Sequence, residues 1–78
     1  MDNTIFENLK RMLVDNLKVE ESEIVATAEL TNDLGINSLE LADLVLMCEE
    51  EFDIEINARA ANKLKTVGDV VKYLETLA

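Results

Sequence analysis

The chain has 78 residues, enough for one small domain with a limited core. Apolar residues make up 49% of it, too many for a disordered acidic tail, and its net charge of −10 disfavours nucleic acid and anionic lipid as partners. One cysteine and no histidine exclude an intramolecular disulfide and Cys/His zinc sites. We therefore expect one all-α, soluble, cytoplasmic domain over residues 1–78, whose partners present basic surfaces.

Membrane and secretion signals are missing from the pattern. Residues 1–7 lack a basic region followed by an apolar run, so no secretory signal is expected. No apolar stretch approaches the roughly 18 residues that a membrane-spanning helix needs. We expect no stable insertion into a membrane.

The first expected element is an amphipathic helix from Thr4 to Leu17. A long connection, Lys18 to Asn37, follows, and its scattered apolar residues predict an ordered strap that packs onto the core, with a short turn near residues 27–30. The helix prediction depends on apolar residues that recur at steps of three and four: Ile5, Phe6, Leu9, Met12, Leu13 and Leu17.

A second helix is expected from Ser38 to about Asp53. Serine is a preferred N-cap residue, so Ser38 is expected to cap this helix. Its core stripe consists of Leu41, Leu44, Val45, Cys48 and Phe52. The opposite side combines large apolar side chains with carboxylates, which predicts a docking patch for a partner. The patch consists of Leu39, Glu40, Asp43, Leu46, Met47 and Glu50.

Two further elements complete the expected fold. After Ile54 and Ile56, which we expect to be buried anchors, residues 58–63 predict a short third helix. Thr66 and Asp69 form a capping-box pattern that starts the last helix. Its stripe consists of Val67, Val70, Val71, Leu74 and Leu77. The fold class is therefore a small four-helix bundle with a long loop between helices one and two and a short third helix.

The residue types argue against catalysis by this chain alone. There is no histidine to act as a base, and no activating partner for Ser38 is visible in the sequence. The three glutamates at residues 49–51 predict at most weak binding of divalent cations, and no specific metal site is predicted. What remains is a serine that another enzyme modifies: a helix N-terminus favours an attached phosphate group, and Gly35 permits a tight turn before it.

The segment Asp33-Leu34-Gly35-Ile36-Asn37-Ser38-Leu39-Glu40, together with the acidic run at 49–51, resembles the acyl carrier proteins. The resemblance covers nearly the whole chain. It implies that Ser38 receives a 4'-phosphopantetheine arm from coenzyme A, transferred by a phosphopantetheinyl transferase. Asp33, Leu34, Gly35 and Asn37 would form the supporting turn. Acyl groups would ride as thioesters on the arm to loading and chain-processing enzymes with basic docking patches, while the carrier stays a monomer.

Two positions depart from the family pattern. The family usually has aspartate immediately before the serine, where this chain has Asn37, and its third helix is typically acidic, where this chain has Arg59 and Lys63 with Lys65 just beyond. These departures favour a specialised carrier over the housekeeping one of fatty acid synthesis. Cargo could be a fatty, polyketide, amino-acid or other acyl unit. The alanines at 58–61 leave room for a chain between helices two and three, or simply allow close packing.

A second hypothesis, of a different class, remains open. An acidic helical module that is never modified could bind a basic protein or divalent ions through the same surface. Twelve of the seventeen acids, and none of the seven bases, lie between residues 19 and 58, which suits either hypothesis.

Overall fold

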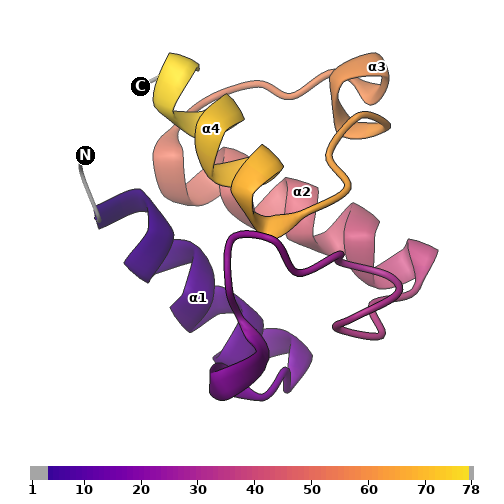
Figure 1. Cartoon of the computed structure of the whole chain (residues 1–78). Coiled ribbons are helices and arrows are strands. Elements are labelled where there is room, and N and C mark those ends of the chain that lie inside the picture. The colour runs from indigo at the N-terminus through magenta and orange to yellow at the C-terminus, as the bar shows by residue number, and fades with distance from the viewer. Residues whose placement is uncertain (1–3, 78) are drawn as a thin grey trace.

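The computed structural model describes residues 4–77 as an all-α domain (Figure 1). Residues 1–3 and 78 lie outside the described residues, and part of the expectation of no secretory signal falls there. The elements are α1, Thr4–Leu17; a 3₁₀ helix, Glu21–Glu23; α2, Ser38–Phe52; α3, Ala58–Ala61; and α4, Val67–Leu77. The predicted all-α fold, with a long loop after α1 and a short third helix, is confirmed.

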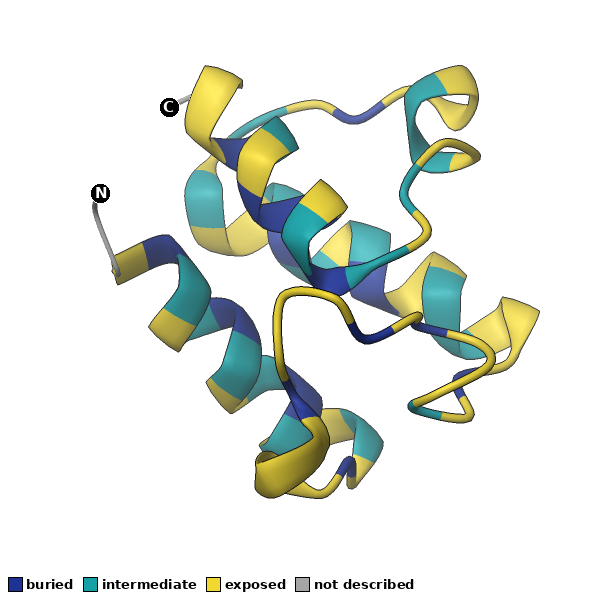
Figure 2. Cartoon of the chain, in the orientation of Figure 1, coloured by how far each residue is buried: buried dark blue, intermediate teal, exposed yellow. Residues whose placement is uncertain are grey.

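The core forms where the predicted stripes of α1, α2 and α4 meet (Figure 2). Helix α1 packs against both α2 and α4. The side chains of Leu9, Leu13 and Leu74 are almost completely buried. One residue of the predicted stripes is wrong: Leu77, near the end of α4, is 43% exposed. Four other predicted core residues are only half-buried, although they pack against the core: Leu41, Val45, Phe52 and Ile54. The stripe of α4 extends beyond the last turn that the core covers.

The connection between α1 and α2 is an ordered strap, as predicted. Ile24, Ala28, Leu30 and Ile36 are buried along it. The expected short turn near residues 27–30 is present, since the N–H of Ala28 donates to the carbonyl of Val25 at 3.0 Å, and an unpredicted 3₁₀ helix lies earlier, at Glu21–Glu23. Although it is long, the strap stays in place because buried side chains recur along its whole length.

Backbone hydrogen bonds fasten the strap to the start of α4. The N–H of Leu30 donates to the carbonyl of Lys65 at 2.8 Å, and the N–H of Val67 donates to the carbonyl of Ala28 at 3.0 Å. The N–H of Gly68 donates to the carbonyl of Ala26 at 2.8 Å. A Cβ at position 68 would lie 2.9 Å from that same carbonyl oxygen, so this glycine is needed for close approach.

The predicted capping box of α4 is confirmed. The N–H of Asp69 donates to the Thr66 hydroxyl at 3.1 Å, and the Asp69 carboxylate accepts from the N–H groups of Thr66 and Lys65, both at 3.1 Å. These backbone hydrogen bonds lower the pKa of Asp69. Helix α3 is shorter than the predicted 58–63 because Asn62 is its C-cap residue.

Candidate functional site

The turn before α2 depends on a glycine and an aspartate. Gly35 has φ +71°, a left-handed conformation that glycine adopts without strain. Its N–H donates to the Thr31 carbonyl at 3.1 Å, and the carboxylate of Asp33 accepts from the Glu29 N–H at 2.7 Å. These contacts fix the chain direction immediately before the first residue of α2.

Asn37, and not Ser38, is the N-cap of α2, so the prediction that Ser38 caps the helix is wrong. The Asn37 side chain accepts from the Glu40 N–H at 2.8 Å, and the Glu40 carboxylate accepts from the Asn37 N–H at 3.0 Å. This reciprocal pair is a complete capping box. The sequence contains the signal: glutamate lies three residues after Asn37, whereas Leu41 lies three residues after Ser38.

Ser38 is the first residue of α2, and its side chain is exposed. Because Asn37 caps the helix, the Ser38 hydroxyl is not used there, and it makes no hydrogen bond to any residue in the range 4–77. Over the same range the backbone N–H groups of Ser38 and Leu39 have no acceptor. An exposed hydroxyl beside free N–H donors at the positive end of a helix dipole suits an attached phosphodiester.

The outer side of α2 carries an acidic and apolar stripe: Leu39, Asp43, Leu46 and Glu50. These four residues follow one another at steps of four, three and four residues, so they share one helix face. All four are exposed; Leu39 is exposed to 78% and Leu46 to 58%, unusually high values for leucine. The two other predicted docking residues differ: Met47 is half-buried against the core, and Glu40 belongs to the capping box.

A cavity of about 270 Å³ lies between α2, α3 and α4. Ser38 lines it, and so does Cys48 ten residues along α2, which corresponds to about 15 Å along the helix axis. The other walls are mainly apolar: Leu30, Leu41, Ala42, Leu44, Val45, Ile56, Ala58, Ala61, Asn62, Leu64, Val70, Tyr73 and Leu74. The serine therefore lies at one end of an apolar space within the bundle.

Sequence reasoning missed the polar cavity residues Asn62 and Tyr73. Each lies where the helical pattern needs only a boundary or half-buried residue, so no periodic signal identifies it as a cavity residue. Tyr73 also lines a shallow depression between α4 and the loop before it.

The Cys48 thiol is buried in the cavity wall and stays protonated. Burial raises its pKa to about 12, and the charges of Glu49 and Glu51 add to the effect. A thiolate is the nucleophilic form of cysteine, so Cys48 is unreactive at neutral pH. Ser38 is exposed, so its hydroxyl, unlike the Cys48 thiol, is accessible at the cavity.

The acidic run at 49–51 has a structural role in part. The Glu49 carboxylate accepts a hydrogen bond from the Ile56 N–H at 2.7 Å, which ties the end of α2 to the loop before α3. In the part of the chain that the structure describes, no group of three or more acidic or cysteine side chains could hold a metal ion.

The length and polarity of each helix show whether it could span a membrane. None of the helices within residues 4–77 is both long enough and apolar enough to cross a bilayer.

Comparison with known families agrees with this geometry. The family model described as "Phosphopantetheine attachment site" matches residues 7–74, which include the four α-helices except for the ends of α1 and α4. Proteins of this family carry a covalently attached 4'-phosphopantetheine group. The predicted resemblance to the acyl carrier proteins is thereby confirmed. This chain belongs to the phosphopantetheine-binding family of carrier proteins.

Proposed function

We propose that this chain carries acyl groups as thioesters on a 4'-phosphopantetheine arm attached to Ser38, and delivers them to enzymes of fatty acid, polyketide or related biosynthesis. The observation that carries the proposal is the free, exposed Ser38 hydroxyl at the end of an apolar cavity. The arm supplies the thiol that binds the acyl group. Residues 1–78 then act as one non-catalytic, monomeric carrier domain in the cytoplasm.

Ser38 is supported in this role by its neighbours. Asp33 and Gly35 shape the turn, Leu34 is half-buried beneath it, and Asn37 caps α2 and so leaves the serine hydroxyl free. The free N–H groups at the start of α2 would hold the phosphodiester. A phosphopantetheinyl transferase, and not this chain, would activate the hydroxyl.

The cavity favours a cargo with an apolar part. Its walls are mainly aliphatic, and a methylene group that leaves water for such a space gains about 0.8 kcal/mol. A fatty or reduced polyketide chain would therefore be sheltered between α2 and α3, whereas a polar amino acid would gain little. The acidic and apolar stripe of α2 would meanwhile meet the basic docking patches of partner enzymes.

The test uses the only two serines of the chain, Ser22 and Ser38. Wild type, Ser22→Ala and Ser38→Ala are incubated with coenzyme A, magnesium and a broad-specificity transferase, and intact masses are measured. We expect one phosphopantetheine addition to wild type and Ser22→Ala, and none to Ser38→Ala. Wild type that gains no mass with several transferases would contradict the proposal.

The alternative of an unmodified acidic module has its own signature. It requires that Ser38→Ala keep the function in the cell while charge reversal at Asp43 and Glu50, which are exposed and outside the capping box, removes it. The carrier hypothesis requires the function to be lost in both variants.

A further inference from the structure

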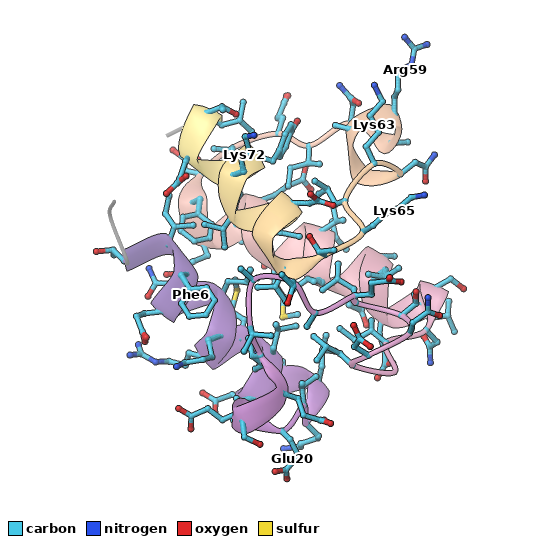
Figure 3. The ribbon with its side chains drawn as sticks, viewed as in Figure 1. Phe6, Glu20, Arg59, Lys63, Lys65 and Lys72 are labelled. Carbon is cyan, nitrogen blue, oxygen red and sulfur yellow. The ribbon has the colours of Figure 1, made fainter. Side chains whose placement is uncertain are left out.

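Four of the seven basic residues lie between residues 59 and 72 (Figure 3): three on α3 and the loop after it, and one on α4, where it lines a depression together with Lys63. We call this set the basic face; it consists of Arg59, Lys63, Lys65 and Lys72. All four side chains are exposed. No acid occurs between residues 56 and 68, although the chain as a whole has seventeen. The basic face is therefore a local reversal of a strongly acidic surface.

Within residues 4–77 the basic face forms no salt bridge. Elsewhere, the ammonium group of Lys10 lies 3.6 Å from a carboxylate oxygen of Glu7 and 3.6 Å from one of Glu21. Among the described residues, no side chain of the basic face comes within 4 Å of a carboxylate oxygen in this way. In Figure 3 the side chains of Arg59, Lys63 and Lys65 extend outward from α3 and the loop after it. These three charges are available to a partner, whereas Lys72 lies near the Asp69 carboxylate and contributes to lowering its pKa.

The basic face also lies beside the site. Ala58 and Ala61 of α3, and its C-cap residue Asn62, line the cavity together with Ser38. Lys65 lines a neighbouring depression together with Leu41 of α2. An enzyme that reaches a group attached to Ser38 therefore meets α2 and α3 in the same encounter.

The overall charge decides which class of partner fits. A molecule of net charge −10 is repelled at a distance by nucleic acid and by anionic lipid, both of which carry negative charge over their whole surface. A protein can instead place a small acidic patch next to a basic one. Such a surface would attract both the acidic stripe of α2 and the basic face.

We infer that the basic face is a second docking element, which fits an acidic patch next to the basic docking site of a carrier-dependent enzyme. This inference rests on the proposed role of Ser38. The basic face also selects against enzymes whose docking site is basic throughout, because the like charges at α3 oppose binding.

A matched pair of double variants tests the inference. Arg59→Glu with Lys63→Glu reverses the basic face, and Arg11→Glu with Lys18→Glu reverses two exposed bases in and just after α1, so both variants have the same net charge. Circular dichroism melting confirms that each variant is folded. Binding is measured for the purified carrier-dependent enzymes encoded beside this gene, before and after Ser38 is loaded.

We expect the basic-face variant to weaken binding to the cognate enzyme about tenfold, and the α1 variant to change it by less than about twofold. Equal or tighter binding of the basic-face variant to every enzyme that binds wild type would overturn the inference. So would binding to phosphatidylglycerol vesicles or to duplex DNA that disappears in the same variant. Loading of Ser38, followed by mass spectrometry, tests the proposed function separately.

Discussion

Asn37 and Glu40 hold each other across the first turn of α2, each accepting a hydrogen bond from the backbone N–H of the other. This relationship explains how asparagine starts the helix at the position where the resemblance to acyl carrier proteins would place aspartate. Either side chain can cap a helix, so the substitution removes one negative charge and leaves the geometry of the turn intact.

Substitutions of Asn37 distinguish the effect of the helix cap on stability from the effect of a negative charge at this position. We expect Asn37→Ala to lower the free energy of unfolding by about 1 kcal/mol because the Glu40 N–H loses its acceptor. Asn37→Asp keeps an acceptor and is expected to be within about 0.5 kcal/mol of wild type. Urea denaturation measures both. Ser38→Ala is the control, since the serine side chain makes no hydrogen bond within the described residues; an equal loss in that variant would contradict the assignment of the cap.

The two glycines are required for different reasons, which substitution can distinguish. Gly35→Ala is expected to cost about 1 kcal/mol because of the left-handed φ alone, since no atom lies within 4 Å of the new Cβ. Asparagine tolerates that conformation, so Gly35→Asn should be milder. Gly68→Ala meets the Ala26 carbonyl and should cost about 1–3 kcal/mol. Gly68→Asn should be no milder than Gly68→Ala; relief by asparagine at position 68 would contradict this account.

The cavity prediction compares two neighbouring alanines of α3. We expect an octanoyl group on the arm to raise the melting temperature of wild type by at least about 5 °C, because its methylenes leave water. Ala61→Leu places a larger side chain in the cavity wall and should remove most of this increase. Ala60→Leu, on the same helix but outside the cavity lining, should retain it. Equal increases in both variants would show that the chain lies elsewhere.

Cys48 predicts an alkaline loss of stability. Its thiol has an ordinary pKa of 9.0 and a folded pKa of about 12, so the unfolded state releases the proton first as pH rises. The stabilisation is complete below about pH 9 and declines between pH 9 and 12. Over that window the slope should be steeper than in Cys48→Ala, by up to about 1.4 kcal/mol per pH unit. Denaturation at pH 8 to 10.5 measures the difference; parallel slopes would refute the prediction.

The same burial predicts slow thiol chemistry, measured on the unloaded chain so that no arm thiol interferes. A disulfide reagent should react with native Cys48 far more slowly than with the chain unfolded in guanidinium, because the native thiol is buried and protonated. Equally fast reaction of the two states would contradict the burial of Cys48.

The periodic parts of the chain were predictable and the local exceptions were not. Helices α1 and α4 follow from stripes of apolar residues and, in α4, from the Thr66 cap, because each signal is repeated or reciprocal. The cap of α2 was misassigned because asparagine and serine are both good N-cap residues, and only the glutamate at position 40 distinguishes them. The requirement for Gly68 depends on Ala26, distant in sequence, so no local pattern reveals it.

For the site, the sequence predicts the position of the serine better than its surroundings. Ser38, Gly35 and the outward residues of α2 follow from one short segment. The cavity does not follow from a short segment, because its walls come from three helices and from the strap. In the sequence pattern, a residue such as Tyr73 looks like an ordinary half-buried position. Contacts between elements decide which half-buried residues border empty space.

Three backbone hydrogen bonds join the strap to the start of α4. We expect the parts of the domain that they connect to be more stable against local unfolding than α3. Leu30, on the strap side of the cavity, belongs to the part that includes α1, α2 and α4. Helix α3 has no buried residue and only four residues of its own. Amide hydrogens of α3 should therefore exchange with solvent through brief local opening, while those at Leu30 and Val67 exchange only when the whole domain unfolds. We therefore expect the α3 side of the cavity to open more readily than the strap side and, under the proposed function, cargo to enter and leave there.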